Sequence, residues 1–136
     1  MNNFDLKDRV AIVTGGAQGF GFAITERFIK SGAKVIIWDI DKKAADEAME
    51  KLNTNDCSYK IIDVQNFEEV NQNLNEIEKK LGKIDIFINN AGIAGKNANV
   101  DEYPIDEWNR VIDLNLNAVF YCCRAVVPFM VKNNYG

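Results

Sequence analysis

Short apolar segments alternate with helix-like segments along the whole chain, and this alternation restricts the possible folds more than any other feature. The apolar segments span residues 9–14, 34–39, 59–62 and 84–89, and the first of them is RVAIVT, a β-branched run that ends in glycines. Such runs are typical of strands that are buried on both faces. Strands joined by helices lie parallel with right-handed crossovers, so the sequence predicts an α/β fold with helices on both faces of a parallel sheet.

The segments between the strands show helical periodicity. Within residues 19–30, Phe20, Ile24 and Phe28 recur every four residues and predict one apolar face. Asp41 is expected to cap the next helix, which runs to Leu52.

The two later helices carry clear boundary signals. Asn66 is the expected cap of a helix over 67–81, and Gly82 is expected to end it. The last helix is expected over 106–133, where Pro128 should kink the helix or help to end it. Between them, residues 91–101 contain glycines and asparagines and predict a long loop.

Composition narrows the class of protein. The chain has 136 residues, of which 47% are hydrophobic, and a net charge of −4 without a basic cluster. This is enough apolar material for one domain over residues 1–136, and the charge disfavours nucleic-acid and anionic-membrane partners. The longest uninterrupted apolar runs are far shorter than a membrane span of about 20 residues, and residues 1–8 show no signal-peptide pattern.

Histidine and cysteine usage excludes several chemistries. The sequence contains no histidine, which removes Ser-His-Asp and Cys-His catalysis and nearly every zinc site. The three cysteines are Cys57, Cys122 and Cys123, an odd set without a CxxC spacing. They favour a reducing compartment, and we expect a cytoplasmic protein without a metal. Adjacent helical residues do not share a face, so Cys122 and Cys123 are expected to be small buried hydrophobes.

The turn after the first strand has the sequence Thr14-Gly15-Gly16-Ala17-Gln18-Gly19-Phe20-Gly21. Glycines permit positive φ and let a backbone approach a diphosphate closely, and the following helix directs its N–H groups and its positive dipole end at the same place. The turn therefore predicts a nucleotide site. The alternative is an ordinary strand-to-helix turn.

Asp39 ends the second strand and sharpens this prediction. In a doubly wound fold, whose first four strands lie in the order 3-2-1-4, an acid at this place accepts hydrogen bonds from the adenosine ribose. It also repels a 2′-phosphate, since two charges about 4 Å apart repel by about 4 kcal/mol at an effective dielectric constant of about 20. Ile40 and Gln18 are neutral, which favours NAD over NADP, although Lys42 and Lys43 weaken the preference. The alternative for Asp39 is a solvated strand end.

The ordered set of motifs resembles the N-terminal part of the short-chain dehydrogenase/reductase family, with its 3-oxoacyl-ACP reductase-like and sugar or polyol dehydrogenase-like members. The resemblance covers essentially all of the chain and implies a Rossmann-type fold. It departs at Phe20, where relatives carry an aliphatic residue, and we expect Phe20 to pack under the turn. The motifs are TGxxxGxG at Thr14–Gly21, Asp39, Asp63-Val64, Asn89-Asn90-Ala91-Gly92 and Asn115.

The resemblance implies roles for these residues. Asp63 would meet the adenine amino group, Val64 would pack on the ring, and residues 89–92 would lie along the cofactor ribose. Asn115 would hold a water in a catalytic proton relay. The alternatives are a turn that braces the sheet at residues 89–92 and, for Asn115, a polar residue that bends its helix by bonding its backbone. The expected cofactor-binding residues are Gly15, Gln18, Gly19, Phe20, Gly21, Asp39, Ile40, Asp63, Val64, Asn89, Ala91 and Gly92.

The family's catalytic Ser and Tyr-x-x-x-Lys are not found in this sequence. Tyr59, Tyr103 and Tyr121 are followed at the fourth position by Asp, Glu and Ala. We therefore expect a truncated NAD-binding part that does not transfer hydride alone. The whole enzyme would interconvert a secondary alcohol and a ketone in a 3-oxoacyl thioester, a sugar acid or a polyol. A non-catalytic nucleotide-binding module and a scaffold without a ligand are the alternatives.

Apolar surfaces are expected to remain exposed in a truncated NAD-binding part of this kind. The segment 84–89 would form a sheet edge, and the helix over 106–133 would lack neighbours. We expect homo-oligomers, formed through this helix. Trp38, beside Asp39, is expected to belong to the strand core.

Overall fold

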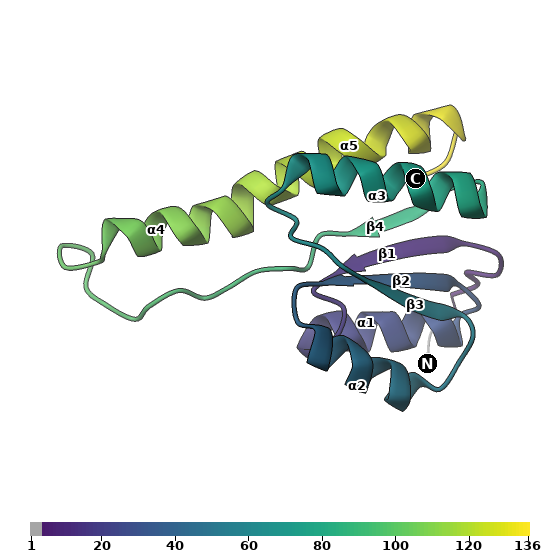
Figure 1. The fold of residues 1–136 in the computed structure, drawn as a ribbon, viewed down its shortest axis with the longest axis horizontal. Helices are drawn as coiled ribbons and strands as arrows, with labels where there is room; N and C mark the ends of the chain where they lie inside the picture. Colours follow the sequence, from purple (N-terminus) through teal and green to yellow (C-terminus); the bar gives the residue numbers. More distant parts are fainter. Residues whose placement is uncertain (1–3) are drawn as a thin grey trace.

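A single parallel sheet organises residues 4–136, which the computed structural model describes (Figure 1). Within these residues the strand order is β3-β2-β1-β4, as the sequence predicts. Val13 of β1 pairs with Ile37 of β2 and with Ile88 of β4, and all pairings are parallel. The strands are β1 (Val10–Thr14), β2 (Lys34–Asp39), β3 (Cys57–Ile61) and β4 (Ile86–Ile88).

Alternate residues of the strands form two separate cores. Val10 and Ile12 of β1 face one core, and Ala11 and Val13 face the other. This period of two is the geometry of a strand buried on both faces. The prediction from the continuous apolar runs is therefore confirmed.

Helices cover both faces of the sheet (Figure 1). One face packs on α1 and α2 with many alanines, which allow a close approach, and the other packs on α3 and α5. Trp38 belongs to the second core, where it is fully buried and meets Phe87 edge to face at 5.5 Å. The helices are α1 (Gly19–Lys30), α2 (Lys42–Leu52), α3 (Phe67–Leu81), α4 (Ile105–Ile112) and α5 (Ala118–Lys132), with a π-helical turn η1 (Asp113–Asn117) between the last two.

The predicted caps are confirmed. The Asp41 side chain accepts a hydrogen bond from Ala44 N–H at 3.0 Å, and the Asn66 side chain accepts one from Glu69 N–H at 3.2 Å. Gly82 ends α3 with φ of 80°. Pro128 lies inside α5, which ends at Lys132.

The expected position of Phe20 is wrong. Its side chain is 87% exposed and does not pack under the turn. Because α1 begins at Gly19, Phe20 lies in its first turn, and the fully buried residues of this helix are Gly21 and Thr25. The partly buried Ile24 and Phe28 do pack against the core, as expected from their spacing.

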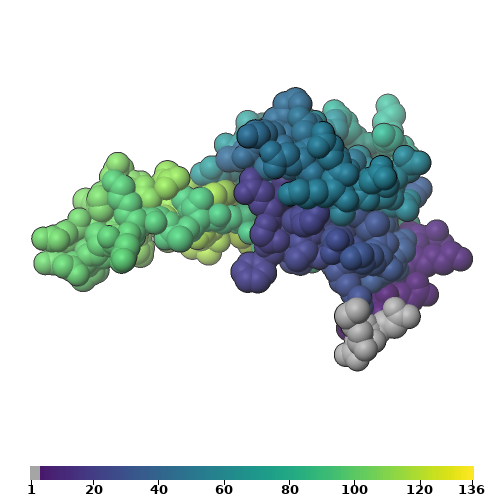
Figure 2. All heavy atoms as spheres, turned by 90° about the horizontal axis from the view of Figure 1, so that it is seen from below, coloured from purple at the N-terminus to yellow at the C-terminus, as the bar shows by residue number. Residues whose placement is uncertain are grey.

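The helix from α4 through η1 to α5 extends past the end of the sheet, and α4 with the preceding loop forms a projecting arm (Figures 1 and 2). Within residues 4–136, the continuous helix Ile105–Lys132 is long and apolar enough to cross a membrane, judged by length and composition alone. The lengths of the apolar runs in the sequence did not predict this. A helix that packs inside a protein meets the same criterion. Here the α5 part packs against α3.

Candidate nucleotide site

The glycine turn after β1 lies at the carboxyl end of the sheet, where two of its glycines have positive φ. Gly15 has φ of 59° and Gly19 has φ of 52°. A Cβ atom on Gly15 would lie 3.1 Å from Ala91 Cα, and one on Gly21 would overlap the Gly15 carbonyl oxygen. A Cβ on Gly19 would meet no atom within 4 Å. The turn is therefore closed on its inner side and open at Gly19.

The N-terminus of α1 differs from those of α2 and α3 in its capping. Gln18 is the cap residue, but its side chain makes no capping hydrogen bond, and the first turn contains no acid. By contrast, Asp41 and Asn66 cap the next two helices. The first N–H groups of a helix lack intrahelical acceptors and carry partial positive charge, so α1 presents donors to an anion beside Gly19.

The Asp39 carboxylate lies against this turn. Its Oδ2 atom accepts a hydrogen bond from Ala17 N–H at 3.2 Å, and its Oδ1 atom accepts one from Asp41 N–H at 3.1 Å. Gln18 reaches the same place, where its Nε2 atom donates to Asp41 Oδ2 at 3.4 Å. Ile40 is 71% exposed beside them. The glycine turn and the end of β2, which were predicted separately to bind a nucleotide, thus contact each other.

Asp63 and Val64 follow β3 at the same edge of the sheet. The Asp63 carboxylate is exposed and accepts a hydrogen bond from Gln65 N–H at 2.9 Å, which forms a tight turn. Val64 is only 6% exposed, and its side chain packs in the core on the α3 face. It therefore presents mainly its backbone at this edge.

Thr14 and Asn90 join the ends of β1 and β4. The Thr14 hydroxyl donates to the Ile88 carbonyl oxygen at 3.1 Å and accepts from the N–H groups of Asn90 and Ala91, each at 2.9 Å. The Asn90 side-chain amide donates to the carbonyl oxygens of Thr14 at 2.9 Å and Gly15 at 3.1 Å. The sequence placed Asn90 only within the range 89–92 along the ribose and gave Thr14 no role, so the support that the two residues give to the turn was not predicted. A hydroxyl and an amide at two adjacent strand ends are the signal that would have found them.

Asn115 lies in η1, and its side chain bonds the loop that follows β4. Its Oδ1 atom accepts from Ile93 N–H at 2.9 Å, and its Nδ2 atom donates to the Ile93 carbonyl oxygen at 2.8 Å. Its Oδ1 atom would also lie 3.2 Å from a Cβ on Gly92. The Asn115 amide thus bonds the backbone of the loop through its oxygen and one of its N–H groups, and not the backbone of its own helix as the alternative from the sequence supposed.

The thiols lie apart from the turn and differ in burial. Burial raises the pKa of Cys57 to about 11 and that of Cys122 to about 12. Cys122 is buried as expected, but the expectation is wrong for Cys123, which is partly exposed and whose Sγ atom accepts a hydrogen bond from the Asn89 side chain at 3.5 Å. Within residues 4–136, no three His, Cys, Asp or Glu side chains are grouped so as to hold a metal ion.

Taken chemically, this edge of the sheet offers two complementary features. Backbone N–H donors and a helix dipole at Gly19 suit a diphosphate, and the nearby Asp39 carboxylate suits a vicinal diol. The adjoining ends of β3 and β4 continue the same surface. These are the chemical features that a dinucleotide requires.

Comparison with known proteins identifies the family. A short chain dehydrogenase family profile matches residues 9–136. The chain is 42% identical over 129 residues to an NAD(+)-dependent 2-dehydro-3-deoxy-L-rhamnonate dehydrogenase of a Sphingomonas species, covering 94% of this chain and 51% of that protein. It is 40% identical to a probable NADP-dependent mannitol dehydrogenase of Yarrowia lipolytica, covering 100% of this chain and 50% of that protein.

Solved structures agree with this assignment. The crystal structure of an NAD+-bound xylitol dehydrogenase superimposes with a TM-score of 0.92 at 29% identity, covering 98% of this chain and 52% of that one. The chain therefore spans about half the length of the curated relatives it matches. The match over nearly every residue, together with the ordered motifs at one sheet edge, shows that the chain belongs to the short-chain dehydrogenase family.

Proposed function

We propose that these residues form the NAD-binding part of an oxidoreductase that interconverts a secondary alcohol and a ketone. The observation that carries the proposal is the contact between the glycine turn and Asp39, whose Oδ2 atom lies 3.2 Å from Ala17 N. The open space at Gly19 and the uncapped N-terminus of α1 fit the diphosphate of the cofactor. The residues present therefore fit NAD.

Each predicted residue has a defined task in this proposal. The N–H groups of residues 18–21 bind the diphosphate, and the Asp39 carboxylate accepts hydrogen bonds from the adenosine ribose. Asp63 and the Val64 backbone border the adenine, and residues 89–92 lie along the second ribose. When bound, the nicotinamide supplies hydride chemistry. Asn115 holds the loop after β4 in place and orders a water near the reacting centre.

The preference for NAD over NADP rests on charge. Asp39 and Asp41 place two carboxylates at the ribose position, and the two nearby lysines pair with acids of their own helix, Lys42 with Asp46 and Lys43 with Glu47. A 2′-phosphate would meet net negative charge there. The names of the relatives include both cofactors, so the preference is a property to be measured on this chain.

The names of three of the relatives support one substrate class, since they include a sugar acid and two polyols, while other relatives are named for 3-oxoacyl-ACP or hydroxysteroids. We propose a polyhydroxylated substrate for the whole enzyme. No Tyr-x-x-x-Lys occurs in this sequence, so we propose that residues 1–136 bind NADH without catalysing hydride transfer.

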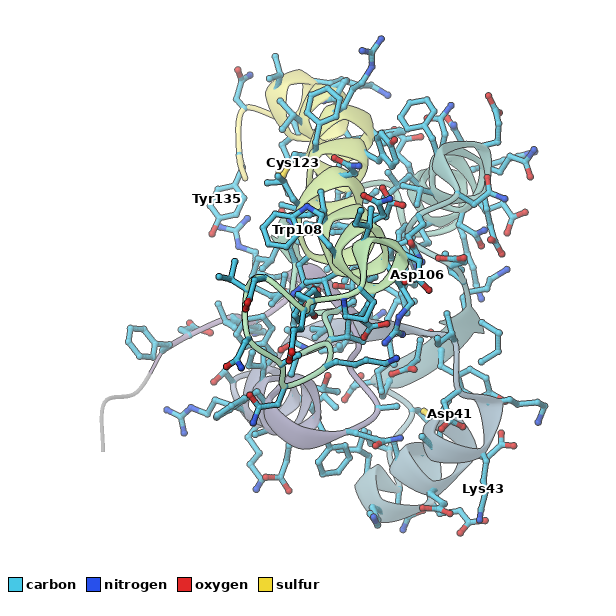
Figure 3. All side chains as sticks on the ribbon, turned by 90° about the vertical axis from the view of Figure 1, so that its left-hand side faces the viewer. Asp41, Lys43, Asp106, Trp108, Cys123 and Tyr135 are labelled. Carbon is cyan, nitrogen blue, oxygen red and sulfur yellow. The ribbon has the colours of Figure 1, made fainter. Side chains whose placement is uncertain are left out.

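The exposed face of the long helix supports the proposed homo-oligomer. Trp108, Leu116 and Phe120 are each about 60% exposed, at 58%, 60% and 58%. Viewed along the helix, Trp108 lies on the side opposite Asp106 (Figure 3). An apolar stripe on one side of a helix is typical of an interface, and light scattering after size-exclusion chromatography tests it.

Calorimetric titration of the chain with NADH tests the binding proposal, and the Gly19→Val variant serves as the control. Saturable binding to the native chain and its loss in the variant are expected, since a valine side chain would occupy the open space at Gly19. Because Gly19 has φ of 52°, circular dichroism must show that the variant is folded. The absence of binding to the correctly folded native chain would refute the proposal. A turnover assay of the chain with NAD and polyols tests the proposed lack of catalysis, because hydride transfer by residues 1–136 would contradict it.

A further inference from the structure

Lys42, the first residue of α2, is held by an ion pair that no motif of the sequence singles out. Its Nζ atom lies 2.6 Å from Asp46 Oδ2. The Tyr59 hydroxyl, from β3, donates to Asp46 Oδ1 at 2.5 Å. Both oxygens of this carboxylate are thus engaged, one by its own helix and one by the neighbouring strand. The hydrogen bonds from Lys42 and Tyr59 lower the pKa of Asp46, so it remains ionised at neutral pH.

The direction of the Lys42 side chain matters because the carboxylates of Asp39 and Asp41 lie just before it in the chain, at the proposed ribose position. Asp41 is the adjacent residue, and its N–H donates to Asp39 Oδ1 at 3.1 Å. Side chains on a helix lean toward its N-terminus, which for Lys42 is the direction of Asp39 and Asp41. Asp46 lies one turn further along the helix. The ion pair therefore holds the ammonium group away from the two carboxylates at the ribose position.

We propose that Asp46, supported by Tyr59, is a positioning residue for cofactor selectivity that keeps Lys42 away from the ribose 2′ position. This inference rests on the proposed NAD site. With Asp46 removed, the Lys42 ammonium would be free to approach a 2′-phosphate and offset its repulsion by Asp39. The structure thus assigns selectivity to two contributions: an acid that repels the phosphate and a lysine that is withheld from it.

The neighbouring pair on the same helix provides a matched control. Lys43 Nζ lies 3.9 Å from Glu47 Oε1, and the Lys43 side chain is 89% exposed. Figure 3 labels Lys43 on the surface of α2. This lysine is hardly restrained, so removing the Glu47 charge measures the general effect of a lost acid without releasing a held lysine.

The experiment is a calorimetric titration of the chain with NADH and with NADPH. The variants are Asp46→Asn, Asp46→Glu, Glu47→Gln, Lys42→Met and the double variant Asp46→Asn with Lys42→Met. Asp46→Asn is expected to raise the affinity for NADPH relative to NADH by about two- to fivefold, the range for one partly exposed charge pair. Asp46→Glu, which restores the carboxylate, is expected to keep the native ratio.

The double variant and the control decide the mechanism. The gain is expected to vanish in the Lys42→Met background, and Glu47→Gln is expected to change the ratio less than Asp46→Asn does. An equal gain in Glu47→Gln, a gain that persists without Lys42, or an unchanged ratio in Asp46→Asn would each overturn the inference. Loss of folding alone cannot mimic the result, because the readout is a ratio of two affinities. If the native chain binds NADH but Asp46→Asn leaves the ratio of the NADPH and NADH affinities unchanged, only this inference is refuted. If the native chain does not bind NADH, the proposed function is refuted as well.

Discussion

Asn90 donates two hydrogen bonds to Thr14 and so joins the end of β4 to the end of β1. The Asn90 N–H donates to the Thr14 hydroxyl oxygen, and the Asn90 side-chain amide donates to the Thr14 carbonyl oxygen, both at 2.9 Å. The same amide also donates to Gly15 O at 3.1 Å. The residue that follows the neighbouring strand β4 thus holds the start of the glycine turn, so the conformation of the turn depends on Asn90 as well as on its own residues.

Asn90→Ala removes the side-chain half of this arrangement. Two partly buried carbonyl oxygens lose their donor, and the free energy of unfolding should fall by about 1–3 kcal/mol. NADH affinity should fall with it, because the turn loses its support. Asn89→Ala is the control for stability, since the exposed Asn89 amide contacts only Cys123 Sγ among the contacts described. Chemical denaturation measures stability and calorimetry measures NADH affinity, and an equal loss of stability in the two variants would contradict the role of Asn90.

Substitutions of Gly19 and Gly21 should have different effects, the first mainly on NADH affinity and the second mainly on stability. A Cβ on Gly21 would overlap the Gly15 carbonyl oxygen, so Gly21→Ala is expected to distort the turn and lower stability markedly. A Cβ on Gly19 meets nothing, and Gly19→Ala should cost only about 1–2 kcal/mol for its left-handed backbone while weakening NADH binding. Thermal unfolding monitored by circular dichroism, paired with NADH titration, distinguishes the two. Undiminished NADH affinity in Gly19→Ala would argue against a diphosphate at this place.

Asp39→Ala should erode the preference for NAD. The substitution removes the carboxylate that accepts from the ribose and that repels a 2′-phosphate, so NADH affinity should fall and NADPH affinity should rise. The expected change in their ratio is about tenfold or more, equivalent to about 1.4 kcal/mol. Titration of both cofactors measures it. Equal affinities of the native chain for NADH and NADPH would already refute the assigned role.

Asp85 should make stability depend on acid pH. Burial alone would raise its pKa, but hydrogen bonds from Val10 N–H and Lys83 and the ion pair with Arg9 outweigh burial and lower it. A carboxyl group with a lowered folded-state pKa stabilises fully above its unfolded pKa of about 3.9 and progressively less as the pH falls through the folded-state value. The stability difference between the native chain and Asp85→Asn should therefore be constant near neutral pH and shrink below about pH 4. Denaturation at several pH values measures it, and a difference that grows in acid would contradict the assignment.

The three thiols should react at very different rates. The raised pKa values of Cys57 and Cys122, about 11 and 12, leave almost no thiolate at pH 8, and both side chains are buried. Cys123 is partly exposed. A thiol reagent at pH 8 should label Cys123 first in the folded chain and all three in urea, as peptide mass spectrometry would show. Fast labelling of Cys122 in the folded chain would contradict the described packing.

The elements were predictable from the sequence because each depends on local patterns. Apolar runs and the caps Asp41 and Asn66 gave the strands and helices to within a few residues. β4 is shorter than predicted, since only Ile86–Ile88 pair with β1, although Asp85 N–H still donates to Val10 O at 2.9 Å. The π-helical turn was not predicted, because no local signal marks it.

The contacts of the site were harder to predict, since they depend on pairs far apart in the chain. Periodicity put Phe20 on the buried face, but in the first turn of α1 the buried residue is Gly21, and the Phe20 side chain is exposed. The pairing of Asn115 with Ile93 spans 22 residues, and that of Asn90 with Gly15 spans 75. A sequence motif identifies such residues, but it does not distinguish those that support the turn from those that would contact a ligand.

The two hydrogen bonds between Asn115 and Ile93 have a mechanical consequence. They fasten the middle of the long helix to the loop directly after Gly92, so the segment that leads into the arm and the helix that leaves it are joined at the base of the arm.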